Sequence, residues 1–185
     1  NYISQFTKAD ERIPLNIIGV SGDLKTNVEA YIGELSQEDL SQWRETLPRL
    51  RKASREALES MGYYQAEVKF TRQQKSIDIH ITPNQAVIIE SVKLSYVGEA
   101  SNDIAFTALQ ETFPIKEGQV LHHGRYESAK SLLQNMALER GYFDGKWLEH
   151  EAIIAQGTQQ ATINLRYDSG KRYKFGQVFF SQSTS

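Results

Sequence analysis

The chain contains no cysteine, so disulfide bonds, thiolate nucleophiles and cysteine ligands for a metal are excluded. It also lacks an apolar run near the roughly 20 residues that a membrane-spanning helix needs, and its first residues show no signal-peptide pattern. A formal net charge of -2 over 185 residues provides no strong field for nucleic acid or an acidic membrane surface. What remains is the composition of an ordinary folded protein, 39% hydrophobic and 24% charged.

Metal-binding patterns are missing as well. His122 and His123 are adjacent, so their side chains diverge on a helix or a strand, and no third ligand stands at zinc spacing. We interpret this pair as part of a surface loop before a helix. His80 and His150 sit singly at polar strand positions and are expected in solvent. We predict no metal site and no cofactor.

Catalytic patterns are equally scarce. The acid pairs Glu38-Asp39 and Glu149/Glu151 have no nucleophile or histidine base near them, and no Gly-x-Ser-x-Gly elbow exists. We expect Glu38-Asp39 in a polar loop between helices. The chain is therefore predicted not to be an enzyme.

An internal repeat is the main positive signal. Gly62-Tyr63-Tyr64 recurs 79 positions later as Gly141-Tyr142-Phe143, each time after a helical pattern and before a strand-like one. Apolar positions before each joint match at the same offset: Leu47, Leu50, Ala53, Ala57 and Leu58 with Tyr126, Ala129, Leu132, Met136 and Ala137. After about five extra residues, Ile79 and Ile81 match Ile163 and Leu165.

Each copy has the order strand, helix, helix, strand, strand. The expected elements of the first copy are a strand over 13–19, a helix over 24–32, a helix over 47–61 with Pro48 in its first turn, and strands over 64–71 and 77–81. Those of the second copy are strands over 92–97, 143–154 and 161–167, and helices over 104–113 and 126–140.

This order predicts an α+β fold. Two helices must cover one face of a small sheet, the last two strands pair as a hairpin, and a helical crossover places the first strand parallel to the third. Each unit is thus a three-stranded mixed sheet of order 1-3-2, with its second strand as a free edge. The expected domains are residues 13–85 and 86–171, after an extension over 1–12 and before the first strand of a truncated third copy over 172–185.

The repeated joint has a structural interpretation. Gly62 and Gly141 can adopt the left-handed conformation that ends a helix. If the strand starts at once, alternation places Tyr64 on the helix side and Tyr63 on the opposite face. Phe143 is then the buried equivalent in the second copy, beside Tyr142.

The free edge of the first unit is the candidate binding surface. An extended guest strand can pair with its backbone by β-augmentation. The predicted contact residues are Tyr63, Gln65, Glu67, Val68, Lys69, Phe70 and Thr71. The alternative is an edge guarded by charge, in which Glu67, Lys69 and Arg72 prevent such pairing.

The second helix of the first unit carries a basic face. Its cations are Arg49, Arg51, Lys52 and Arg55, and the acids at helical spacing are Glu45, Glu56 and Glu59. The face can meet an acidic partner or lipid headgroups, but we favour a solvated face balanced by these acids.

The order of elements and the Gly-Tyr-aromatic joint resemble the POTRA domains of outer-membrane protein assembly factors, in particular the first two POTRA domains of the TamA type and the start of a third. The stretches that carry the likeness are LNIIGVSGDLKTNVEAYI, ALESMGYYQAEVKF, SLLQNMALERGYFDGKW and INLRYDSGKRYKFGQVFF. The likeness implies the periplasmic portion of a Gram-negative outer-membrane protein, attached through a C-terminal β-barrel absent from this chain. It also implies a TamB-like, inner-membrane-anchored partner and unfolded outer-membrane protein clients such as autotransporters.

Two alternatives stay open. One is a POTRA array from a BamA-type or two-partner-secretion barrel. The other is a periplasmic small-ligand receptor or enzyme with a cleft at the Pro83–Ala86 joint, for which Asn84, Gln85 and Glu90 are the available polar residues.

Overall fold

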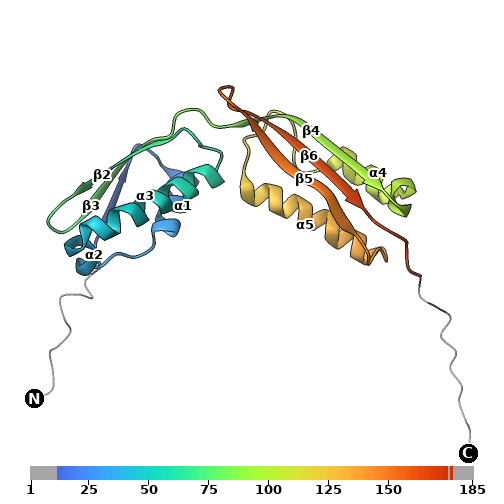
Figure 1. Cartoon of the computed structure of the whole chain (residues 1–185), viewed down its shortest axis with the longest axis horizontal. Coiled ribbons are helices and arrows are strands. Elements are labelled where there is room, and N and C mark those ends of the chain that lie inside the picture. The colour runs from blue at the N-terminus through green and yellow to red at the C-terminus, as the bar shows by residue number, and fades with distance from the viewer. Residues whose placement is uncertain (1–11, 175, 177–185) are drawn as a thin grey trace, which may run out of the picture. The chain divides into compact units, whose positions relative to one another are not determined.

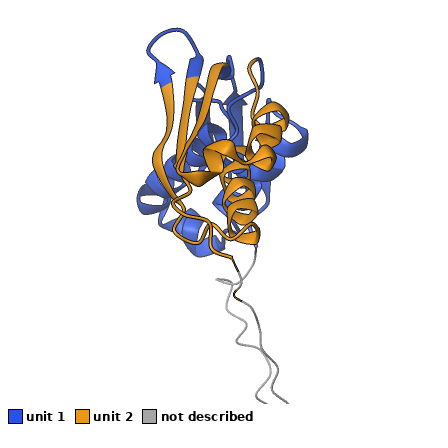
Figure 2. Cartoon of the chain, turned by 90° about the vertical axis from the view of Figure 1, so that its right-hand side faces the viewer, with its two compact units in different colours: residues 1–89, 118–124, 154–161 blue, residues 90–117, 125–153, 162–185 orange. Residues whose placement is uncertain are grey.

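The computed structural model describes residues 12–174 and residue 176. The chain forms two compact units: unit 1 comprises residues 1–89, 118–124 and 154–161, and unit 2 comprises residues 90–117, 125–153 and 162–185 (Figure 2). The expected extension over 1–12 and strand over 172–185 lie largely outside the described residues. The contiguous domain boundaries expected from the repeat stay a prediction.

Unit 1 follows the predicted strand–helix–helix–strand–strand order with one added short helix (Figure 1). Its elements are β1 (Leu15–Ile18), α1 (Gly22–Ile32), α2 (Gln37–Ser41), α3 (Trp43–Ser60), β2 (Glu67–Arg72) and β3 (Ile77–Thr82). The strands are ordered β1-β3-β2, with β1 parallel and β2 antiparallel to β3. The predicted mixed sheet of order 1-3-2 is confirmed.

The central strand β3 shows why the helices cover one face only. Ile77, Ile79 and Ile81 are buried, whereas the alternate residues of this strand are half-buried or exposed. The buried isoleucines pack in one cluster with α1, through Val28 and Ile32, and with α3, which contributes Leu50, Ala57 and Leu58. The core of unit 1 therefore lies between β3 and the two long helices.

The sheet of unit 2 has the same arrangement, with β6 in the centre. The elements are β4 (Ile88–Val97), the 3-10 turn η1 (Glu99–Asn102), α4 (Ile104–Thr112), α5 (His123–Glu139), β5 (Lys146–Ala155) and β6 (Gln160–Asp168), and the strand order is β4-β6-β5. In β6, Ala161, Ile163, Leu165 and Tyr167 are buried at alternate positions.

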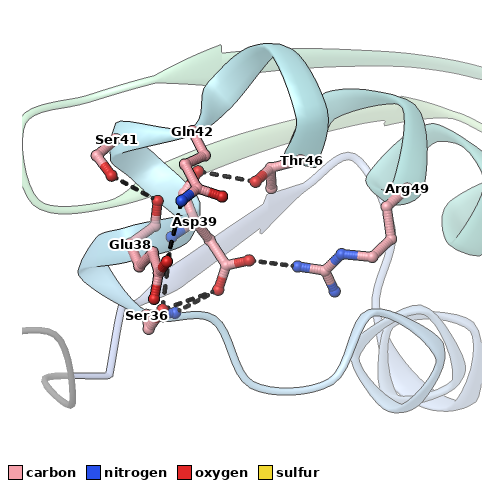
Figure 3. A network of polar contacts seen from close by, with 7 residues as sticks. All are labelled: Ser36, Glu38, Asp39, Ser41, Gln42, Thr46 and Arg49. Carbon is pink, nitrogen blue, oxygen red and sulfur yellow. Dashed lines mark hydrogen bonds and ion pairs between the residues drawn. The ribbon is translucent and has the colours of Figure 1, made fainter.

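The short helix α2 corrects the expectation that Glu38-Asp39 belongs to a loop. Ser36 and Asp39 form a capping box: the Ser36 N–H donates to Asp39 Oδ2 at 2.8 Å, and the Asp39 N–H donates to Ser36 Oγ at 3.4 Å. Arg49 of α3 donates to Asp39 Oδ1 at 2.6 Å, and the Thr46 hydroxyl donates to the Asp39 carbonyl at 2.9 Å (Figure 3). Asp39 therefore connects α2 to α3.

The prediction that Pro48 lies in the first helical turn is wrong, because α3 begins at Trp43 and encloses this proline. Burial of Thr46 and the packing of Trp43 against the core extend the helix upstream of Pro48. Pro48 itself is exposed.

Candidate functional site

Strand β2 lies at one edge of the unit 1 sheet. All six of its residues, Glu67–Arg72, pair with β3, and no other described strand pairs with it. The backbone groups on its outer side are therefore open to an extended guest chain. The opposite edge of the sheet is β1, which is only four residues long.

The seven residues predicted to bind a partner fall into two sets. Glu67, Lys69 and Thr71 are exposed, whereas Val68 and Phe70 are half-buried and pack against the core. Tyr63 and Gln65 precede the strand, and the Gln65 carbonyl already accepts a bond of 2.8 Å from Asn84. The structure thus places five of the seven on the edge strand and two in the turn before it.

A groove of about 180 Å³ runs between α3 and β2. The apolar part of its lining includes Leu58, Ala66, Val68 and Phe70, and α3 also contributes Arg51 and Arg55. The groove therefore adjoins the free edge and lies on the face of the sheet toward which Val68 and Phe70 point.

The basic face of α3 is balanced only in part. Arg49 pairs with Asp39, and Lys52 lies 3.9 Å from Glu56. Arg51 and Arg55 are exposed and have no ion-pair partner among the described residues. These two guanidinium groups place two positive charges on the α3 side of the α3–β2 groove.

Both Gly-aromatic joints end a helix with the same hydrogen bonds. Gly62 has φ 93° and Gly141 has φ 89°. The Tyr63 N–H donates to the Leu58 carbonyl at 2.9 Å, and the Tyr142 N–H donates to the Ala137 carbonyl at 2.9 Å. Together with the bonds from the two glycines to the carbonyls three residues earlier, these are Schellman motifs.

The expectations for Phe143 and Tyr63 are wrong. Phe143 is 58% exposed, whereas Tyr142 is 2% exposed. In unit 1 it is Tyr63 that packs against the core cluster, and Tyr64 is half-buried. Tyr64 lines the α3–β2 groove together with Ala66, Val68 and Phe70, whereas Tyr63 lies in the turn before β2 and also reaches the core.

Unit 2 holds a polar cluster that the sequence reasoning missed. Asp103 is 8% exposed and caps α4 by accepting a bond of 3.0 Å from the Ala105 N–H. Arg140 donates to both of its carboxylate oxygens, at 2.9 and 2.8 Å, and the Tyr142 hydroxyl donates at 3.0 Å. Burial alone raises the pKa of Asp103, but the bonds from Arg140, Ala105 and Tyr142 outweigh it and hold this pKa below its usual value.

The residues considered for ligand chemistry do not converge on a site. Within residues 12–174 and 176, no three His, Asp or Glu side chains are placed to hold a metal ion. His123, expected in a loop, is the first residue of α5, and its Nε2 contacts the Tyr64 hydroxyl. Asn84, one of the polar residues considered for a cleft at Pro83–Ala86, donates its side-chain amide to the Gln65 carbonyl.

None of the described helices is long and apolar enough to span a membrane.

The fold defines a class of small α+β units in which two long helices cover one face of a β1-β3-β2 sheet whose antiparallel edge strand is open. Residues 14–83 match the family model described as "POTRA domain TamA domain 1". Residues 14–83 therefore form a POTRA domain of the TamA type, as their sequence predicts. POTRA domains are protein-interaction modules in the periplasmic parts of outer-membrane proteins.

Three solved structures show a distant similarity to the chain. BamA POTRA3-5 of Haemophilus influenzae is 13% identical, with a TM-score of 0.45 over 85% of this chain and 65% of that one. POTRA1-3 of Omp85 from Anabaena is 11% identical, with a TM-score of 0.44 over 84% and 61%. CdiB from Escherichia coli is 16% identical, with a TM-score of 0.31 over 88% and 28%. The chain thus spans less than two thirds of each, and the family assignment rests on residues 14–83.

Proposed function

We propose that the chain is the periplasmic interaction part of a TamA-like outer-membrane assembly or translocation factor, which docks a TamB-like partner and outer-membrane protein clients such as autotransporters. The supporting observation is the β2 edge beside the α3–β2 groove. β2 is a six-residue strand with a single neighbour, so a guest strand can pair with it through the backbone, whatever the sequence of the guest.

The groove adds selectivity to this pairing. A strand added to β2 points every second side chain toward the helix side of the sheet, where the groove is lined by Leu58, Val68 and Phe70. An apolar residue at these positions is desolvated there. An acidic residue beside it can approach Arg51 and Arg55, the two cations of the groove without an internal partner.

The charge preference can be measured with two synthetic peptides of alternating apolar and polar residues, identical except that the polar positions carry Glu in one and Lys in the other. We expect the Glu peptide to bind about two- to fivefold more tightly per contacted arginine, as for exposed ion pairs. The double variant Arg51→Glu/Arg55→Glu should reverse the preference. Arg44→Glu, an exposed α3 position that does not line the groove, should leave it unchanged.

The binding position can be mapped by NMR titration with the same peptides. Amide shifts should concentrate in Glu67–Arg72 and on the adjoining face of α3. Shifts confined to α1 and α2, or equal binding by both peptides in all variants, would contradict the proposal.

The partner class can be tested because the chain has no native cysteine. A Lys69→Cys variant carrying a photo-crosslinker should capture a TamB-like protein or an autotransporter segment in the periplasm. Ile18→Cys, on the opposite edge and 45% exposed, is the matched control. Equal capture from both edges, or capture from neither, would refute this function.

A further inference from the structure

The last turn of α5 and the joint after it form an exposed apolar surface in unit 2. Leu138 is 50% exposed, Phe143 is 58% exposed and Tyr173 is 53% exposed. The rings of Phe143 and Tyr173 lie 5.7 Å apart, and a groove of about 450 Å³ borders all three residues. Three large apolar side chains gathered at one groove are unusual for a surface without a partner.

The corresponding surface of unit 1 is covered. There the chain segment 118–124, which belongs to unit 1, lies over the joint. Val120 Cγ1 and the Leu121 carbonyl oxygen are within 2.7 Å of the point where a Gly62 Cβ would stand. His123 contacts Tyr64, which is the counterpart of Phe143.

The covering segment is held through the backbone of the residues that follow β3. The Leu121 N–H donates to the Val87 carbonyl and the Ile89 N–H donates to the Gln119 carbonyl, each at 2.8 Å. Val87 in turn donates to the Gly62 carbonyl at 2.8 Å. The covering segment therefore forms an isolated antiparallel bridge, between Val120 and Ile88, at the start of β4.

In unit 2 the joint glycine accepts the same backbone hydrogen bond, but no described segment corresponds to the one that covers the joint of unit 1. The Tyr173 N–H donates to the Gly141 carbonyl at 2.8 Å, as Val87 does to Gly62. The Tyr173 hydroxyl donates to Asp144 at 2.7 Å, which orients its ring beside Phe143. Leu138 occupies the position of Glu59, so this surface is more apolar than its covered counterpart.

We propose that the groove formed by Leu138, Phe143 and Tyr173 is the docking surface for the inter-helix loop of a further repeat, a short extended segment with adjacent apolar residues, as in Val120-Leu121. The occupant follows from the internal repeat: the same joint in unit 1 is covered by the segment that precedes α5, the second long helix of the next copy. The proposal extends the organisation of the protein and does not depend on what β2 binds.

Single cysteines in this cysteine-free chain can test it. Glu139→Cys lies in the lining of the groove and leaves the apolar residues intact, and Gln134→Cys on the same helix is an exposed control outside the lining. Alkylation rates are compared between the 185-residue chain and a longer chain that carries a further repeat after Ser185. The rate at Glu139→Cys should fall at least about tenfold on extension, and that at Gln134→Cys should not change.

A second variant separates docking from a general loss of access. Phe143→Ser in the extended protein should restore alkylation of Glu139→Cys, without lowering the melting temperature of the 185-residue chain. Equal rates at Glu139→Cys in the two lengths would overturn the proposal. So would protection already present in the 185-residue chain, whether constant, which indicates cover by its own residues, or rising with concentration, which indicates a second copy.

Discussion

Replacement of Asp103 tests whether the polar cluster of unit 2 stabilises the fold. Its carboxylate accepts four hydrogen bonds: one from Ala105, two from Arg140 and one from Tyr142. Asp103→Ala removes all four acceptor interactions. Asp103→Asn retains one acceptor oxygen for the Ala105 N–H, but it places an NH2 group where Oδ2 accepts from Tyr142 and Arg140, and it removes the negative charge that faces Arg140.

The expected loss of stability depends on how exposed the hydrogen-bond partners of Asp103 are. Loss of the cap of α4 costs about 1 kcal/mol. Breaking a fully buried ion pair costs about 3–5 kcal/mol, but the Arg140 side chain is 32% exposed and regains part of its hydration. We expect Asp103→Ala to lower the free energy of unfolding by about 3 kcal/mol, and Asp103→Asn by about half as much.

The assay is urea unfolding followed through Trp147, which lies in unit 2. Trp43 in unit 1 is replaced by Phe so that Trp147 is the single tryptophan reporter. The folded pKa of Asp103 lies below the usual value of 3.8, so its stabilisation is complete above that pH and is lost as the pH falls through the folded pKa. The difference between the wild-type protein and Asp103→Asn should therefore shrink below about pH 3.8. A loss under about 1 kcal/mol for Asp103→Ala, or equal losses for Ala and Asn, would refute this reasoning.

Three further predictions can be checked by the same denaturation experiments. Gly62→Ala should cost more than Gly118→Ala, because both glycines have positive φ but only at Gly62 would a Cβ meet backbone, 2.6 Å from the Leu121 oxygen; equal costs would contradict the close approach. Ser36→Ala should cost about 1 kcal/mol through loss of the capping box, and an unchanged stability would show that α2 does not depend on it. Tyr142→Ser should cost about 3 kcal/mol and Phe143→Ser less than about 0.5 kcal/mol, because only Tyr142 is buried; the reverse order would restore the original expectation for these rings.

The architecture was predictable because its signals are periodic. The alternation of Ile77, Ile79 and Ile81 identifies a strand with one buried face, and the helical stripe before Gly62 identifies the element that covers it. The position of β2 at an edge then follows from its hairpin with β3 and from the helical crossover that places β1 parallel to β3.

The predictions that are wrong or missing concern residues in turns, helix caps and long-range contacts, which have no periodic pattern. A turn separates each joint from the strand that follows, since β2 begins at Glu67 and β5 at Lys146, so strand alternation does not determine the sides of Tyr63 and Phe143. The capping box of α2 did have a signal, because Ser36 is followed three residues later by Asp39. The ion pair between Asp103 and Arg140 joins residues 37 positions apart. No local sequence pattern indicates which of the many charged residues pair with each other over such a distance.

The hydrogen bond that each joint glycine carbonyl accepts from a residue beyond the hairpin has a consequence for how such a chain can vary. The Gly62 carbonyl accepts from Val87, 25 positions later, and the Gly141 carbonyl accepts from Tyr173, 32 positions later. The strands of the second hairpin are longer, with 10 and 9 residues against 6 and 6. In both units, however, the segment after the hairpin bonds the same atom, the carbonyl oxygen of the joint glycine. Insertions at the tip of a hairpin thus lengthen its two strands without moving the residue that bonds the joint glycine. Hairpin length can therefore differ between copies while the connection to the following segment is unchanged.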